Sequence, residues 1–306
     1  MPERYSVLHI VVDDWRTEAA IAYGQHHVKT PNLDGLAASS LVFDRAYCQL
    51  ARCAPSRHSF MTGRSPQTTR VLTSSPSFRG GHPSSLQWRT LPEHFKLSGW
   101  LTIGMGKLFP SNSFYDVPRS WSSKRRYFPY DMQRCPGVAD ARKLPRFVPP
   151  TGTWCALTGS LTQFIDYNLS TEALDALDMI AAERRHNPPV LQPFYLMVGL
   201  IRPHGPWMVP AHAWRQYRTA DVPIPSAQGT SYPEGAPLVA AHSSTLWVPP
   251  QRSNDTGAGE LPGGLGNATK VDTSPFERLD ATLVREARHA YYASVTWMDE
   301  QVSAPS

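Results

Sequence analysis

The feature that most constrains the fold is a short apolar run that ends in two carboxylates. Residues 7–12, Val-Leu-His-Ile-Val-Val, are rich in β-branched side chains, and Asp13 and Asp14 follow them directly. Such a run is typical of a strand buried inside a parallel sheet, and α/β sheets bind ligands at the carboxyl ends of their strands. The run therefore predicts an α/β fold with a site near Asp13 and Asp14.

Further along the chain, strand-like and helix-like patterns alternate, which favours a mixed, mostly parallel sheet flanked by helices. The clearest helix pattern covers residues 170–185, where apolar side chains recur on one face. The other predicted strands are 41–47, 101–104 and 194–201, and the other predicted helices are 30–37, 90–99 and 276–302.

The length of 306 residues is enough for one large α/β core, and we expect a single domain over residues 1–306. Residues 111–160 show no sustained period and are expected to be loops. Gly, Pro and Ser are frequent within residues 225–275, which we expect to form a loop-rich insert.

Composition and charge pattern argue against two classes of function, nucleic-acid binding and membrane spanning. The net charge of +5 comes from scattered Lys and Arg residues, with no basic block of the kind that binds nucleic acid. No apolar run approaches the length of a membrane span. The charge suits an anionic substrate, but taken alone it is better explained by a solvated, mildly basic surface.

Four cysteines stand at positions 48, 53, 135 and 155. Cys135 and Cys155 bracket a stretch rich in Pro and Arg, and their spacing fits no zinc pattern. We expect a structural disulfide between them, which would stabilise the fold by about 3 kcal/mol and indicates an oxidising compartment.

Three glycosylation sequons begin at Asn168, Asn254 and Asn267, where about one would be expected by chance. The N-terminal residues lead directly into the first strand, so a signal peptide is not present in this sequence. The sequons favour a secretory protein, lysosomal or secreted, whose leader is absent here.

The motif Cys-Ala-Pro-Ser-Arg at residues 53–57 is followed by Thr-Gly-Arg at residues 62–64. Pro is favoured at the start of a helix, where free backbone N–H groups attract anions. Arg57 would lie one turn along the helix from Cys53, on the same face. The motif thus predicts a sulfur nucleophile beside a cation, and the alternative is a half-buried Cys with a surface Arg.

These motifs together resemble the sulfatase family of the alkaline-phosphatase-like superfamily. Three further segments carry the same resemblance: V-V-D-D-W-R at residues 11–16, T-P-N-L-D-G-L-A at 30–37 and G-K-L-F at 106–109. Within the family, the segments are most similar to those of iduronate 2-sulfatases. The resemblance extends from about residue 5 to 302 and is poor within 225–275.

The resemblance implies a sulfuric ester hydrolase acting on sulfated glycans. A formylglycine-generating enzyme would oxidise Cys53 to formylglycine, whose hydrated aldehyde attacks the sulfur. One Ca²⁺ ion would be bound by Asp13, Asp14 and the modified Cys53. Without the resemblance, the two carboxylates would be interpreted as an acidic turn that caps the next helix.

The resemblance also implies that cations and a histidine contact the sulfate. Arg57 and Lys107 would hold sulfate oxygens, and His204 would protonate the leaving alcohol. Alone, Lys107 would be an ordinary surface lysine and His204 a solvated loop histidine.

The sequence departs from the family at three points. Pro110 stands where relatives carry the histidine that acts as a base, and Arg202 stands where a second histidine is expected, although a cation is kept. The S-D-H-G or S-D-N-G motif that completes the metal site is not in the sequence. We therefore expect a sheet that is incomplete at the C-terminus and weak metal binding.

Two alternatives to the hydrolase stay open. The first is a truncated, non-catalytic sulfatase homologue, which the missing metal motif and Pro110 in place of the histidine both favour. The second is a phosphatase or phosphonate hydrolase of the same superfamily, against which the complete Cys-Ala-Pro-Ser-Arg motif argues.

Overall fold

A computed structural model gives the structure of the chain. It describes residues 5–17, 23–72, 77–79, 82–110, 116, 119–122, 127–128, 135, 154–186, 192–224 and 281–303. The expected insert at residues 225–275 lies outside the described residues, and so do the sequons at Asn254 and Asn267.

The described residues form two parallel sheets and the helices around them. The larger sheet has the strand order β1-β5-β2-β3, and the smaller sheet pairs β4 with β6. The strands are β1 (Val7–Val12), β2 (Leu101–Gly106), β3 (Tyr127–Phe128), β4 (Trp154–Leu157), β5 (Phe194–Leu200) and β6 (Trp207–Pro210). The α-helices are α1 (Pro31–Ala38), α2 (Cys53–Thr62), α3 (Pro66–Thr69), α4 (Leu91–Leu97), α5 (Ile165–His186), α6 (Ala211–Trp214) and α7 (Ala281–Val302), with short 3₁₀ helices at Ser85–Gln87, Leu161–Gln163 and Thr219–Asp221.

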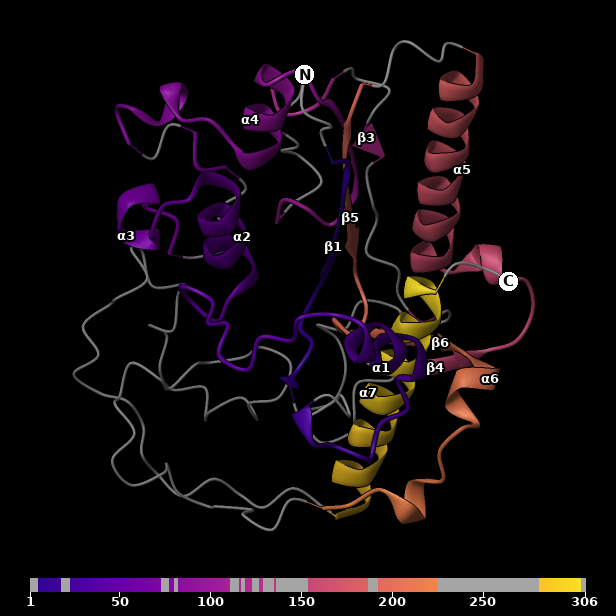
Figure 1. Cartoon of the computed structure of the whole chain (residues 1–306). Helices are drawn as coiled ribbons and strands as arrows, with labels where there is room; N and C mark the ends of the chain where they lie inside the picture. Colours follow the sequence, from indigo (N-terminus) through magenta and orange to yellow (C-terminus); the bar gives the residue numbers. More distant parts are fainter. Residues whose placement is uncertain are drawn as a thin grey trace, which may run out of the picture.

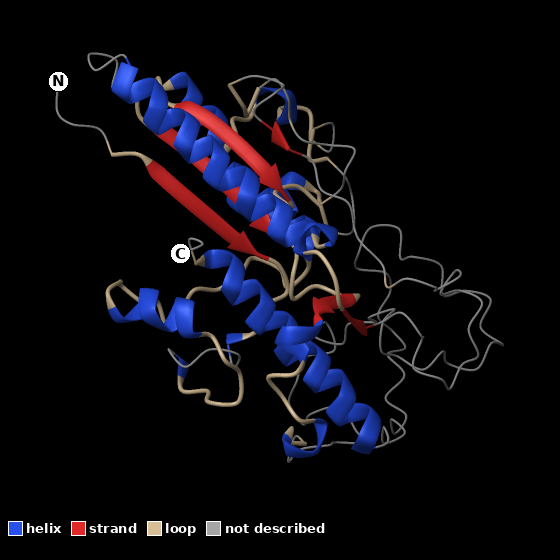
Figure 2. Cartoon of the chain, turned by 90° about the vertical axis from the view of Figure 1, so that its right-hand side faces the viewer, coloured by secondary structure: helices blue, strands red, loops and turns tan. Residues whose placement is uncertain are grey.

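Helices cover both faces of the larger sheet. Figure 1 shows α2, α3 and α4 on one side of the strands and α5 and α7 on the other, and Figure 2 shows α5 lying along the strands. Side chains of β5 alternate between these layers, as a strand buried on both faces requires. Tyr195 and Met197 pack in the cluster on the α2 side, whereas Leu196 and Val198 pack in the cluster with α5 and α7.

The strand register brings three strand ends together. Val12 of β1 lies opposite Leu200 of β5, and Gly106 of β2 lies opposite Gly199. The residues that follow these strands therefore meet at one edge of the sheet. This edge is where the sequence predicts the site.

The structure confirms the predicted fold class, a mostly parallel sheet flanked by helices, and the strands and helices begin and end within a few residues of most predictions. The strand predicted at residues 41–47 is wrong. This segment is irregular, with Leu41, Phe43 and Tyr47 exposed by 79%, 66% and 83%. A strand is stable only beside a partner whose backbone completes its hydrogen bonds, and within the described residues no strand pairs with it.

The structure differs from the sequence prediction in two further ways, at the start of one helix and in two short strands. Helix α5 begins at Ile165 rather than at residue 170, which adds a buried Asp166 to its first turn. Short strands β3 and β4 lie within residues 111–160, which were expected to be loops. Their patterns of two and four residues are too short to be detected by periodicity.

A disulfide joins Cys135 to Cys155 in β4, which is the pairing expected from the sequence. Cys135 is buried in a cluster with Met208 and Trp297, which anchors the small sheet to α7. Among the described helices, none combines the length and the apolar character needed to span a bilayer.

Candidate active site

Helix α2 carries both halves of the sequence signature. It begins at Cys53, whose thiol is free and partly exposed, and Arg52 before it is extended. The helix ends at Thr62 because Gly63 adopts the left-handed region with φ 65°, which favours a residue without a Cβ. The first motif thus opens the helix at its anion-attracting end, and Thr-Gly-Arg closes it.

Asp13 links the end of β1 to α2 and to the residue after β2. Its Oδ1 lies 3.0 Å from Nη2 of Arg57, and its Oδ2 pairs with Nζ of Lys107. All three side chains are buried. Burial by itself would raise the pKa of Asp13, but the positive charges of Arg57 and Lys107 outweigh it and hold the pKa below its usual value. The cluster therefore carries one more positive than negative charge.

The backbone of Lys107 is held as firmly as its side chain. Its N–H donates to the carbonyl of Gly199 at 2.8 Å, and its own carbonyl accepts a hydrogen bond from Nη1 of Arg57. Gly106, with φ 75°, precedes it, and a Cβ on Gly106 would clash with the carbonyl oxygen of Gly199. The close approach of β2 and β5 thus requires glycine and fixes the position of the lysine.

The side chain of Asp14 faces the loop after β5. It adopts the left-handed region with φ 56°, and its Oδ2 lies 3.7 Å from Nε2 of His204. Partial burial and the negative charge of Asp13 raise the pKa of Asp14, and the charge of His204 opposes that effect. The hydroxyl of Tyr291 in α7 donates to the carbonyl of Asp14 at 2.9 Å, which anchors this turn.

His204 lies in the loop between β5 and β6. Its Nδ1 is 2.5 Å from the carbonyl oxygen of Gly205, so Nδ1 carries a proton and Nε2 is the nitrogen that faces Asp14. Arg202, two residues earlier, is buried, and it donates to the carbonyls of His204 and Met208. The positive charge of Arg202 therefore lies within the loop and not beside Asp13.

Ion pairs thus join five of the six predicted catalytic and metal-binding residues in two groups, which do not include Cys53. One contains Asp13, Arg57 and Lys107, and the other contains Asp14 and His204. Sequence reasoning missed Asp166, whose Oδ1 accepts a hydrogen bond from the N–H of Ile201 at 2.6 Å. An acidic residue in the first turn of a helix is common, so the sequence contains no signal that distinguishes it.

The described residues do not fit the Ca²⁺ ion that the resemblance implies. Among them, no group of three or more His, Cys, Asp and Glu side chains is arranged to hold a metal ion. Both oxygens of Asp13 already face cations, so Arg57 and Lys107 compensate its negative charge. Ca²⁺ takes roughly six to eight oxygen ligands, which these two carboxylates cannot supply.

Pro110 occupies the position of the expected base. It follows Phe109, which is fully buried among the aromatic side chains of the α2 side. A proline ring has no group that takes up a proton. This position cannot act as a base.

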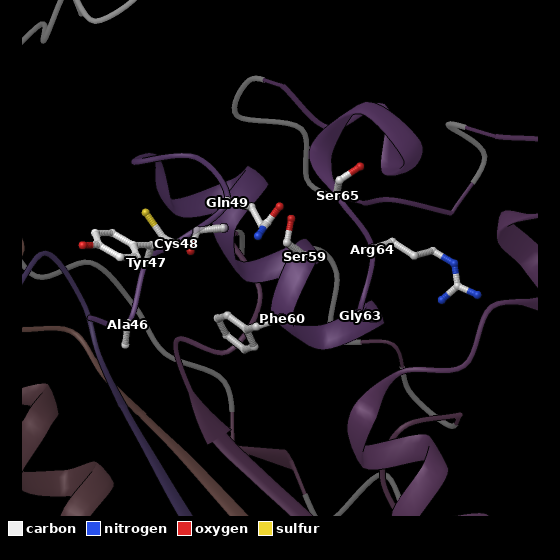
Figure 3. Close-up of a pocket in the computed structure, with 10 residues that line it drawn as sticks. Ala46, Tyr47, Cys48, Gln49, Ser59, Phe60, Gly63, Arg64 and Ser65 are labelled. Carbon is white, nitrogen blue, oxygen red and sulfur yellow. The ribbon is translucent and has the colours of Figure 1, made fainter. Parts of the chain in front are cut away.

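A hollow of about 620 Å³ lies against α2 (Figure 3). Its lining comes from the loop at residues 46–49 and from Ser56, Ser59 and Phe60 of the helix. Neither Asp13 nor Arg57 is among its lining residues. The hollow and the charged cluster are therefore separate features of one helix.

Comparison with known proteins gives a match over nearly the whole chain. The model of the family described as Sulfatase matches residues 6–304. The human iduronate 2-sulfatase is 30% identical over 307 residues, which cover 97% of this chain and 50% of that protein. The chain thus spans about half the length of the curated relatives it matches.

Solved structures show the same fold at lower identity. The phosphonate monoester hydrolase of Agrobacterium radiobacter has a TM-score of 0.56 at 20% identity, covering 97% of this chain and 57% of that one. A protein solved with its substrate D-glucosamine-2-N,6-O-disulfate has a TM-score of 0.53 at 16% identity, covering 98% and 60%.

Proposed function

Because the chain belongs to the sulfatase family, we propose that it hydrolyses sulfate esters of glycans, with a formylglycine made from Cys53 as the nucleophile. The observation that carries the proposal is the buried cluster in which Asp13 joins Arg57 to Lys107. Arg57 lies one turn along the helix that begins at Cys53. The cluster's two cations and one carboxylate leave an excess of one positive charge, which suits a tetrahedral oxyanion.

Formylglycine, when hydrated, supplies one hydroxyl that attacks sulfur and a second that later releases the sulfate. The chain's own residues then have distinct tasks. Arg57 and Lys107 stabilise the negative charge on the sulfate oxygens, and Asp13 holds both cations in place. His204 delivers a proton to the leaving alcohol, a role worth about 10²–10⁴ in rate.

Glycan esters are the proposed substrates because of what the relatives act on. One similar protein is an iduronate 2-sulfatase, and one structural neighbour was solved with a sulfated glucosamine as its substrate. A formylglycine-generating enzyme would be the required partner. The Cys135–Cys155 disulfide supports our further proposal of a lysosomal or secreted location, because such bonds persist in oxidising compartments.

The test compares sulfate turnover with the chemical state of Cys53. The chain is produced together with a formylglycine-generating enzyme, and mass spectrometry measures conversion at Cys53. Hydrolysis of 4-nitrophenyl sulfate is then followed with and without added Ca²⁺. Cys53→Ser should abolish turnover, whereas Cys48→Ser, which removes the other free thiol, should retain it. Fully converted protein that hydrolyses no sulfate contradicts the proposal.

A second candidate function is a non-catalytic homologue. Two observations favour it: no group of three or more ligand side chains among the described residues could hold a metal ion, and Pro110 stands in place of the base. The same assay separates the two, because a non-catalytic homologue has no turnover at any Ca²⁺ concentration. Replacing the sulfate by 4-nitrophenyl phosphate or a phosphonate ester tests the chemistry of the structural neighbour.

A further inference from the structure

Two buried opposite charges lie beneath the loop that carries His204. Arg202 in this loop and Asp166 in the first turn of α5 are each only 1% exposed. A buried charge is costly unless hydrogen bonds and an opposite charge compensate it. The hydrogen bonds of Arg202 and Asp166 therefore show which parts of the loop these two buried charges hold in place.

Arg202 ties two parts of the loop together. Its Nη1 donates to the carbonyl oxygen of His204 at 3.1 Å, and its Nε donates to that of Met208 at 3.3 Å. The planar guanidinium presents several donors in fixed directions, so one side chain can span two carbonyls. The segment from His204 to Met208 is thereby closed over the guanidinium.

Asp166 holds the start of the same loop. Its Oδ1 accepts from the N–H of Ile201 at 2.6 Å, and the backbone of Arg202 also donates to it. Burial lowers the pKa of Arg202 and raises that of Asp166, and the attraction between the two charges opposes both shifts. Asp166 thus holds the backbone of Ile201 and Arg202, from which the guanidinium extends.

Two contacts of His204 lie within this loop. Its N–H donates to the carbonyl of Ile201 at 2.9 Å, and its Nδ1 contacts the carbonyl of Gly205. Nε2 is left to face Asp14. A shift of the backbone would therefore turn the imidazole away from the reaction site.

We propose that Arg202 and Asp166 are positioning residues that hold His204 in the orientation from which it protonates the leaving alcohol. The proposal rests on the proposed sulfatase function for its kinetic consequence and on geometry alone for its structural one. It explains why a cation at position 202 serves the site without contacting the sulfate: the charge acts through the loop.

The variants separate the effect of the charge at position 202 from the effect of the donor geometry of the guanidinium. Arg202→Met removes the charge and both donors, whereas Arg202→Lys keeps the charge but loses the planar pair of donors. Asp166→Asn keeps one oxygen that can accept from Ile201 but removes the charge and one acceptor oxygen, so it is a second variant to measure if Arg202→Met unfolds. Arg218→Met is the matched control, because its side chain is 82% exposed.

The first measurement is hydrogen exchange in peptides that cover residues 201–210, together with the melting temperature. We expect Arg202→Met and Asp166→Asn to accelerate exchange in this segment by at least about tenfold, with β2 and α4 unchanged. Arg218→Met should change nothing there. Unchanged exchange at 201–210 in a folded variant would overturn the proposal, whether or not the protein has turnover.

The second measurement compares two sulfates that differ in leaving group. A nitrophenolate leaves readily without a proton, whereas an alkyl or glycan alcohol needs one. Arg202→Met should lower kcat for the alkyl sulfate by about 10²-fold and for 4-nitrophenyl sulfate far less, with partial rescue in Arg202→Lys. Equal loss on both substrates would mean general damage and would overturn the positioning role. Wild-type protein with no turnover would instead refute the proposed function, and hydrogen exchange would still decide the structural claim.

Discussion

Gly199 lies so close to Lys107 that a Cβ on the glycine would clash with the lysine's carbonyl oxygen. This contact joins the ends of β5 and β2, where the N–H of Lys107 donates to the carbonyl of Gly199. The position of a candidate sulfate ligand is therefore set by a residue that carries no side chain.

Gly199→Ala should displace Lys107 and destabilise the fold. Since the obstacle is backbone, we expect a loss of about 1–3 kcal/mol or more in the free energy of unfolding. Gly35→Ala is the control, because a Cβ on Gly35 in α1 would point into open space. It should stabilise by about 0.5–1 kcal/mol. Urea unfolding of both variants measures the difference, and similar values for the two would refute the interpretation.

The adjacent carboxylates Asp13 and Asp14 should differ sharply in their contribution to stability. Asp13→Asn leaves the cations of Arg57 and Lys107 buried without their counter-charge, so we expect a loss of about 3–5 kcal/mol. The side chain of Asp14 is 56% exposed, and Asp14→Asn should change stability by less than about 0.5 kcal/mol. The free energy of unfolding of both variants, measured in metal-free buffer, tests this difference. Equal losses would mean that Asp13 does not hold the two cations.

How far the sequence predicts the site depends on whether the signal is local. The end of β1 and the start of α2 were predicted because a β-branched run and a Cys-x-Pro-Ser-Arg motif are properties of neighbouring residues. Lys107 and His204 were indicated by the family resemblance, each on a loop after a predicted strand. Their partners in space could not be deduced from spacing alone.

The failures are those in which a long-range contact decides. Residues 41–47 have the composition of a strand, but their backbone has no partner among the described strands. Asp166 has the appearance of a helix-start residue, and only the fold places it beneath Ile201 and Arg202. The cation expected at Arg202 is present, yet the carbonyls of His204 and Met208 bind it inside the loop.

Removal of the disulfide should cost more than removal of a free thiol. Cys135 and Cys155 are separated by 20 residues, and a loop of that size is expected to contribute about 3 kcal/mol through the unfolded chain. The double variant Cys135→Ser/Cys155→Ser should lower the free energy of unfolding by that amount. Cys48→Ser, at an exposed free thiol, should be nearly neutral. A double variant as stable as the wild type would contradict the expectation.

His289 in α7 should make the stability of the fold depend on pH. The ring is buried, stacks on Trp214 at 4.0 Å between centroids, and contacts the hydroxyl of Thr219 and the carbonyl of Trp214. Burial lowers the pKa of His289 below 6.5, although the carbonyl of Trp214 opposes the shift. The folded state therefore favours the neutral ring.

The sign of the effect follows from proton uptake. Between the lowered pKa and 6.5 the unfolded chain binds more protons at His289 than the folded chain, so the stabilising contribution is present above pH 6.5 and is lost as the pH falls through that range. The free energy of unfolding, measured from pH 8 to pH 5, should decrease less in His289→Gln than in the wild type. His27→Gln, at an exposed histidine, should keep the wild-type slope. If His289→Gln keeps it as well, the buried ring does not control this pH dependence.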